Sequence, residues 1–208
     1  AASDVYKRQT THDVSRRSQR RARARPTAPR PVGTATLPRH PGEEHATVEL
    51  GLAGRKAIVT GASRGIGAAT ARLAGERGWR VCVNYNSSPE KAQAVVRSIS
   101  KAGGEAFAHQ GNVGVEADIL AMYQAVDERW GTLDAVINNA GIDHEARFDQ
   151  TTWEQYLKVF NVYIFGVMAS CREEVKRMST AHGGKGGSLV NLGSISARTG
   201  GLPLDVNY

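Results

Sequence analysis

The sequence is poor in cysteine and in long apolar segments, and these two absences exclude several classes of protein. It contains two cysteines in 208 residues, Cys82 and Cys171, which lie in separate apolar segments. Two isolated cysteines cannot build a disulfide framework and favour a reducing compartment, so we predict a cytoplasmic protein without a metal site. No apolar run approaches the about 18 residues that a membrane-spanning helix needs, so we expect no membrane span.

Acidic residues are scarce at the amino end, and this scarcity accounts for most of the formal net charge of +7. Residues 1–47 hold 10 Lys and Arg against 4 Asp and Glu, whereas residues 48–208 hold 17 against 16. Most of the net positive charge therefore lies in residues 1–47. The nearly neutral remainder does not predict a nucleic-acid partner.

The tail at 1–47 has no apolar periodicity and carries five of the seven prolines. It cannot bury enough surface to offset its conformational entropy, so we predict that it is disordered. Three interpretations are open: an arm that binds nucleic acid through arginines, an organellar transit peptide, or sequence that is not translated in nature. The bias towards Arg, Ala and Pro is typical of GC-rich DNA read in any frame. It favours the third interpretation, with a native start near Val48.

From Val48 onwards, short apolar strands alternate with helical segments. The expected strands span 56–60, 80–85, 105–109, 133–138 and 188–192. The expected helices span 66–76, 89 up to the glycines at 103–104, 115–131, and 153–178 as one long helix. This alternation predicts an α/β fold for residues 48–208, a Rossmann-type doubly wound parallel sheet with helices on both faces.

The loop "TGASRGIG" at 60–67 joins the first expected strand to the first helix. Gly61, Gly65 and Gly67 lack side chains, so the backbone can turn tightly and its N–H groups can approach a pyrophosphate at the positive end of the helix. The spacing differs from GxGxxG, and an ordinary tight turn can have the same composition. The position of the loop after the first strand of a βαβ series favours a dinucleotide site.

Four blocks, in order, resemble the short-chain dehydrogenase/reductase family, of the kind found in 3-oxoacyl-carrier-protein reductases and glucose 1-dehydrogenases. They are "TGASRGIG" at 60–67, "NNAG" at 138–141, "VNLGS" at 190–194, and Tyr208 at the family's spacing from Ser194. The resemblance implies a homodimeric or homotetrameric oxidoreductase that moves hydride between a nicotinamide and a small ketone or secondary alcohol. It also implies later strands that the chain lacks.

The resemblance assigns catalytic roles at the carboxyl end. Ser194 would position the substrate oxygen and Tyr208 would supply its proton. A tyrosine needs a nearby cation to act as an acid–base near neutral pH, and the family places a lysine four residues further on, beyond Tyr208. We therefore expect 48–208 alone to be inactive and largely insoluble, with weak dinucleotide binding at most. The alternative is a non-catalytic dinucleotide-binding relative.

Two positions depart from the family's pattern. Alignment on Gly166 puts Tyr163 where the family has an asparagine that holds a water of the proton relay. Asn161 lies two residues upstream, and two residues turn a helix position by about 200°. Either the relay is altered or a helix bulge turns Asn161 round, and we favour the altered relay. Asn112 stands where the family has an acid beside the adenine, so that position keeps a hydrogen-bonding group but loses its charge.

The end of the second expected strand bears on cofactor choice. NAD-binding sites place an acid there for the ribose 2′-hydroxyl, and such an acid repels a 2′-phosphate. The segment from Val81 to Ser88 has no acid. Arg64, Asn86 and Ser87 can meet a phosphate, so NADP is favoured over NAD. The predicted cofactor-binding residues are Gly61, Ser63, Arg64, Gly65, Ile66, Gly67, Asn86, Ser87, Asn112, Val113, Asn139, Ala140 and Gly141.

Overall fold

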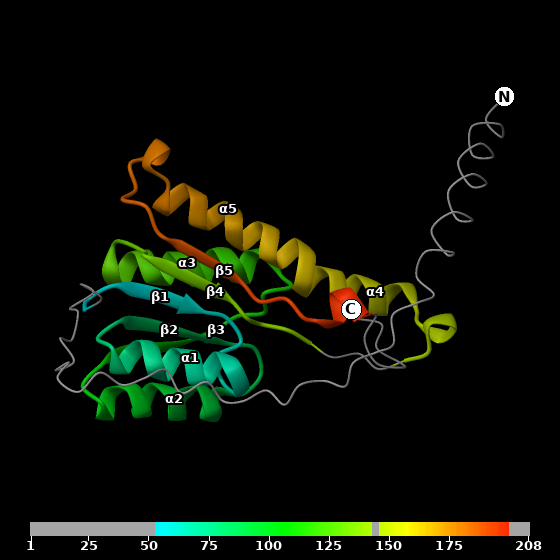
Figure 1. Cartoon of the computed structure of the whole chain (residues 1–208), viewed down its shortest axis with the longest axis horizontal. Coiled ribbons are helices and arrows are strands. Elements are labelled where there is room, and N and C mark those ends of the chain that lie inside the picture. The colour runs from blue at the N-terminus through cyan, green and yellow to red at the C-terminus, as the bar shows by residue number, and fades with distance from the viewer. Residues whose placement is uncertain (1–52, 143–145, 200–208) are drawn as a thin grey trace, which may run out of the picture. The chain divides into compact units, whose positions relative to one another are not determined.

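The computed structural model describes residues 53–142 and 146–199. The tail at 1–47, the expected start at Val48, and Tyr208 lie outside these residues, and what was predicted for them stays a prediction. Five strands of the described part form one parallel sheet in the order β3-β2-β1-β4-β5 (Figure 1). The strands are β1 (Lys56–Val59), β2 (Arg80–Tyr85), β3 (Glu105–Gln110), β4 (Ala135–Asn138) and β5 (Ser188–Asn191).

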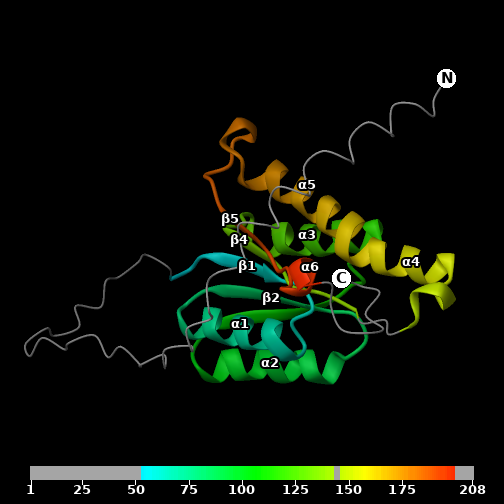
Figure 2. The ribbon, with the colours of Figure 1, turned by 45° about the vertical axis from the view of Figure 1, so that its right-hand side comes forward.

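Helices cover both faces of this sheet. The helices α1 (Gly65–Glu76) and α2 (Pro89–Lys101) lie on one face, whereas α3 (Glu116–Trp130) and α5 (Gly166–Met178) lie on the other (Figure 2). The predicted Rossmann-type doubly wound α/β fold is confirmed. The remaining helical segments are η1 (Phe148–Gln150), α4 (Trp153–Phe160), the π-helix η2 (Asn161–Phe165), η3 (Thr180–His182) and α6 (Ser196–Thr199).

Local sequence explains several helix ends. Pro89 begins α2, where a missing backbone N–H costs nothing. Gly131 follows α3 with a φ of 71°, a left-handed conformation that favours glycine. Before α4, Thr152 and Gln155 form a capping box, because each side chain accepts a hydrogen bond from the backbone N–H of the other.

Alternate residues of the central strands face two separate apolar clusters. On one face Ile58, Cys82 and Val136 pack against α3 and against Met178 of α5. On the other face the strands pack against α1 and α2, through residues that include Val59, Val81, Val83, Ala71 and Val95. Because both faces of the central strands β1, β2 and β4 are covered, these strands are apolar along most of their length rather than at every second position, whereas β5 is exposed at all four residues.

The helix expected over 153–178 is not continuous. The π-helix η2 separates α4 from α5, and the Gly166 N–H donates to the carbonyl of Asn161, five residues earlier. A side chain at Gly166 would run into the carbonyl of Val113 in the loop after β3. The helix therefore crosses this loop at a distance that only glycine permits.

Burial within α3 leads to a test of the core. We expect Ile119→Ala to lower the free energy of unfolding by about 2–5 kcal/mol, because a 1% exposed side chain leaves a cavity when it is removed. Leu120→Ala is the matched control on the same helix, and its 40% exposed side chain should contribute less than about 1 kcal/mol. Urea unfolding of the full-length protein measures both, and equal losses would contradict the assigned burial.

Candidate functional site

The winding of the sheet reverses between β1 and β4. The chain moves from β1 outwards to β2 and β3, then returns to place β4 on the other side of β1. Open α/β sheets bind ligands in the crevice at such a switch point, beyond the carboxyl ends of the strands. A cleft of about 510 Å³ lies at this place and is lined by the loops after β1, β2, β3 and β4.

The cofactor-binding residues predicted from the sequence converge on this cleft. All of them except Gly67 line it. Gly67 lies directly behind the lining, where a Cβ would come within 2.7 Å of the Gly61 carbonyl oxygen and would collide with the Asn139 amide. Five lining residues were not named from the sequence, namely Asn84, Ser88, Gly111, Ile142 and Val162.

The glycine loop turns in a way that other residues could not adopt without strain. Gly61 has a φ of 61° and Gly65 a φ of 57°. A Cβ added to Gly61 would lie 2.8 Å from the Cα of Ala140, which belongs to the loop after β4. The absence of a side chain therefore permits both the turn and the contact between the two loops.

Thr60 and Asn139 hold these two loops together. The Asn139 side-chain amide donates to the carbonyl of Thr60 at 2.8 Å. The Thr60 hydroxyl accepts from the backbone N–H groups of Asn139 and Ala140, both at 3.0 Å. The side chain of Asn139 thus anchors the loop, and its neighbours Ala140 and Gly141 form the wall of the cleft.

Asn84 of β2 is a functional candidate that the sequence analysis missed. It is 2% exposed, and its side-chain oxygen accepts from the Gly61 N–H at 3.2 Å while its amide donates to the Gly111 carbonyl at 3.0 Å. It therefore ties the glycine loop to the loop after β3. The one available signal was a polar residue inside the apolar run of 81–85.

One cation and no acid occur among the described residues that line the cleft. The cation is Arg64, which is exposed and immediately precedes α1. Asn86 and Ser87 are also exposed on the same cleft. Burial lowers the pKa of His109, near the end of β3, although Asp118 opposes this shift. Burial of His109 therefore disfavours a positive charge at this edge of the sheet.

Asn112 uses its side chain within its own loop. Its oxygen accepts from the Gly114 N–H at 2.9 Å, and the Asp118 carboxylate accepts from the Asn112 N–H at 2.9 Å. Such a side-chain turn fixes the backbone that follows β3. Asn112 and Val113 both line the cleft.

A helix bulge, which was one of the two alternatives for this position, is present as η2. The bulge does not bring Asn161 to the loop after β4, because Asn161 is exposed and lies beside Gly114. Tyr163 reaches that loop instead, and its hydroxyl donates to the Ile142 carbonyl at 2.6 Å. A Cβ on Gly141 would lie 2.7 Å from the same hydroxyl. The altered relay itself stays a prediction.

Ser194 lies three residues beyond β5, on the same edge of the sheet as the cleft. Asn191 is in register with Asn138 of β4, so the carboxyl ends of the two strands are level. The Ser194 hydroxyl accepts from the Ser196 N–H at 3.1 Å, and Ser194 is not among the lining residues. Tyr208 lies outside the described residues, so the pairing of these two residues stays a prediction.

The thiols of the described residues are not activated. Cys82 is buried, Cys171 is half-buried, and both are free. Burial raises the pKa of Cys82 well above its usual range and also raises that of Cys171. In the same part of the chain no three His, Cys, Asp or Glu residues gather as metal ligands would, and no helix is long and apolar enough to cross a membrane.

A parallel sheet with a glycine loop and an acid-free cleft at its switch point defines a dinucleotide-binding α/β protein. Comparison with known families is more specific, because the short chain dehydrogenase family matches residues 55–208. The chain belongs to the short-chain dehydrogenase family, as its four sequence blocks predicted. The resemblance to 3-oxoacyl-carrier-protein reductases in particular stays a prediction.

Known relatives are oxidoreductases. The chain is 40% identical over 153 residues to YgfF, an uncharacterised oxidoreductase of Escherichia coli (strain K12), in a match that covers 73% of this chain and 62% of the relative. It is 36% identical over 157 residues to the tetrahydroxynaphthalene reductase of Pyricularia oryzae (strain 70-15), where the match covers 76% of this chain and 54% of the relative.

Solved structures show the same fold. A dehydrogenase/reductase from Sinorhizobium meliloti 1021 is 34% identical with a TM-score of 0.69, over 75% of this chain and 60% of that one. The angucycline C-6 ketoreductase LanV, solved with bound NADP, is 32% identical with a TM-score of 0.68, over 76% and 61%. The chain thus spans little more than half the length of the curated relatives named above.

The contact between Gly61 and Ala140 leads to a prediction for dinucleotide binding. We expect Gly61→Ala to weaken NADPH binding by the full-length protein at least about tenfold, because the new side chain would strain the backbone and push the two loops apart. Gly54→Ala is the matched control. Gly54 has a similar φ of 76°, but a Cβ there meets nothing within 4 Å.

Isothermal titration at equal folded fraction, checked by circular dichroism, measures both variants. The Gly54 variant should keep the wild-type dissociation constant. Similar losses of affinity in the two variants would mean that backbone strain, and not the approach to Ala140, governs the site.

Proposed function

We propose that the intact protein is an NADP(H)-dependent oxidoreductase that interconverts a ketone and a secondary alcohol by hydride transfer, as a cytoplasmic homodimer or homotetramer. The observation that carries the proposal is the charge of the cleft, where Arg64 is the one cation among the described lining residues and acids are absent from them. A guanidinium attracts a 2′-phosphate, and an acid in its place would repel one. The relative LanV, a ketoreductase solved with NADP, supports this assignment.

The residues of the cleft fit such a cofactor. The loop after β1 offers a backbone without side chains at Gly61 and Gly65 and leads into the amino end of α1, which favours a pyrophosphate. Asn86 and Ser87 add neutral donors beside Arg64. Bound NADPH would supply the hydride for ketone reduction.

The proposed catalytic residues act on the substrate oxygen. As a carbonyl carbon accepts hydride, its oxygen gains negative charge and needs a hydrogen-bond donor and a proton. Ser194 donates the hydrogen bond and Tyr208 gives the proton. A lysine beyond Tyr208 would lower the pKa of the phenol into the working range.

Arg64 should decide cofactor preference. We expect Arg64→Ala to lower the ratio of kcat/KM for NADPH to that for NADH at least about tenfold, because a charge-assisted hydrogen bond to the 2′-phosphate is lost. The value for NADH should stay close to wild type. Arg77→Ala, at the other end of α1, removes the same charge outside the cleft and should leave the ratio unchanged. An unchanged ratio in the Arg64 variant would mean that Arg64 does not bind the 2′-phosphate.

Catalysis is tested separately from binding. We expect Ser194→Ala and Tyr208→Phe in the full-length protein each to slow reduction of an acetoacetyl ester at least about 100-fold, with little change in NADPH affinity. Ser188→Ala, at the start of β5, is the control and should keep full activity. Wild-type protein that binds NADPH and reduces no member of a ketone panel would instead support the non-catalytic alternative.

A further inference from the structure

Glu174 of α5 is a carboxyl group inside the protein that the proposed function does not use. It is 0% exposed. Its Oε1 lies 3.1 Å from the Tyr123 hydroxyl, 3.0 Å from the Ser170 hydroxyl and 3.0 Å from the Asn138 amide nitrogen. Its Oε2 is buried and has no hydrogen-bond partner among the described residues. An ionised carboxylate in this position would leave a charged oxygen unsatisfied, which is costly.

The number of hydrogens in this cluster also favours a protonated Glu174. Four oxygen–oxygen contacts occur within it: Tyr123 with Ser170 at 2.7 Å, Tyr123 with Glu174 at 3.1 Å, Ser170 with Glu174 at 3.0 Å, and Ser170 with the Asn138 amide oxygen at 2.8 Å. With Glu174 ionised, the two hydroxyls supply one hydrogen each. The Asn138 oxygen takes that of Ser170, because an amide oxygen cannot donate. A proton on Glu174 would satisfy the contact with Ser170.

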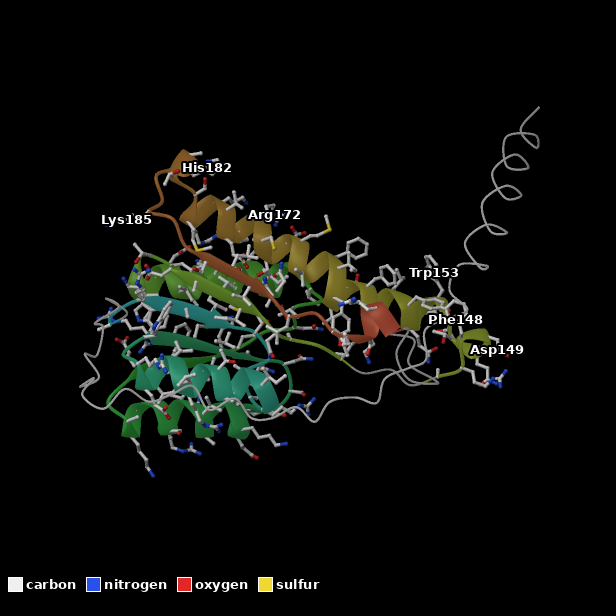
Figure 3. All side chains as sticks on the ribbon, in the orientation of Figure 1. Phe148, Asp149, Trp153, Arg172, His182 and Lys185 are labelled. Atoms are coloured by element: carbon white, nitrogen blue, oxygen red, sulfur yellow. The ribbon has the colours of Figure 1, made fainter. Side chains whose placement is uncertain are left out.

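The neighbouring acid, Glu173, has the opposite surroundings. Burial alone would raise its pKa, but hydrogen bonds from Lys176, Arg177 and Arg172 hold its pKa at about 2. Arg172, which projects from the outer side of α5 (Figure 3), is one of these cations. Glu174 forms no ion pair among the described residues, so burial raises its pKa despite its hydrogen bonds. Two adjacent acids on one helix thus have pKa values shifted in opposite directions.

The cluster contacts the carboxyl ends of β4 and β5, the strands that precede Asn139 and Ser194. Asn138 is the last residue of β4 and directly precedes Asn139, which anchors the loop of the cleft. Its amide nitrogen also donates to the Asn191 side-chain oxygen at 2.9 Å. Asn191 is the last residue of β5, three positions before Ser194. One amide therefore joins Glu174 to the ends of both strands.

We propose that protonated Glu174 is a positioning residue: through Asn138 it holds the carboxyl ends of β4 and β5 against α5 and α3, and loss of its proton loosens the loops that follow. Its consequence for catalysis rests on the proposed function, whereas its consequences for stability and loop order do not. The described titratable and charged groups around Glu174 are Tyr123 of α3, with Cys171, Glu173 and Arg177 of α5. The facing residues of β4 and β5, Asn138 and Asn191, carry no charge.

The sign of the pH dependence follows from linkage. An unfolded glutamate loses its proton near pH ~4.3. If the folded protein retains the Glu174 proton to higher pH, the folded state binds more protons than the unfolded state, and this group makes stability fall as pH rises above that value. Glu173, whose folded pKa is lowered, contributes stability that is lost as pH falls instead.

Three variants of the full-length protein test the proposal. Glu174→Gln keeps the shape and removes the titration, Glu174→Ala removes the contacts, and Glu173→Gln is the matched control. Urea unfolding, NADPH titration, and amide hydrogen exchange of peptides 138–142 and 190–195 are compared with wild type at each pH from about 5 to about 9.

At the acid end we expect the Gln variant to lose at most the contact with Ser170, because an amide oxygen accepts but cannot donate, and so to stay well above the Ala variant. At the alkaline end it should exceed the stability and the loop protection of wild type. The Ala variant should show faster exchange in both peptides at every pH and an NADPH dissociation constant raised about tenfold. Glu173→Gln should lose stability near neutral pH and keep the wild-type decline above it.

Two results would overturn the proposal: a Gln variant with the same alkaline decline as wild type, or one as damaged as the Ala variant at the acid end. The second result would mean that Glu174 is ionised in the folded protein. If wild type binds no NADPH, the proposed function fails, and the unfolding and exchange measurements still decide the role of Glu174.

Discussion

The close approach of the loops after β1 and β4 is the constraint on which the candidate site depends. A Cβ on Gly61 would lie 2.8 Å from the Cα of Ala140, and the Thr60 hydroxyl accepts from two backbone N–H groups of the opposite loop. The two strands are parallel neighbours, but their helices lie on opposite faces, so the loops must separate beyond this contact. The cleft begins where they separate. A side chain at Gly61 would therefore push the loops after β1 and β4 apart and change the shape of the cleft between them.

Buried asparagine side chains form hydrogen bonds at the carboxyl ends of the strands, where the hydrogen-bond ladder of the sheet stops. Backbone groups beyond the end of a parallel strand lose their ladder partners and need others. Asn84, 2% exposed, provides partners to the loops after β1 and β3, while Asn138, 7% exposed, links β4 to β5 and α5. Because these amides are hydrogen-bonded within the protein, the loops around the cleft are held in place before any ligand arrives. This is preorganisation of the kind that lowers the entropy cost of binding.

Motif and periodicity were enough to predict the sheet, the family and most of the cleft lining, since each of those depends on local spacing. Contacts between distant segments were not predictable in this way. In the sequence Asn84 is a single polar residue in an apolar strand. Its hydrogen bonds to the loops after β1 and β3 form only in the folded protein. Glu173 and Glu174 stand in the charged segment at 171–178, which is typical of a solvated helix face, yet both are buried in the folded protein, Glu174 against β4 and α3. The π-helix η2 changes the spacing of the helix over a single turn, and the displacement of Asn161 relative to Gly166 was the one sign of it in the sequence.

Buried, hydrogen-bonded side chains hold the loops of the cleft, whereas the side chains that would recognise a cofactor are exposed. The two groups therefore contribute differently to the affinity for a cofactor. Thr60, Asn84 and Asn138 are buried and already hydrogen-bonded within the protein, so the loops that they hold lose little further freedom when a ligand binds. Arg64, Asn86 and Ser87 are exposed, and a 2′-phosphate must order their side chains as it binds. That entropy cost offsets part of the electrostatic gain. In the proposed enzyme, the ordered loops would therefore provide most of the affinity that NADP and NAD have in common. The exposed residues Arg64, Asn86 and Ser87 would provide a modest difference in affinity between the two cofactors.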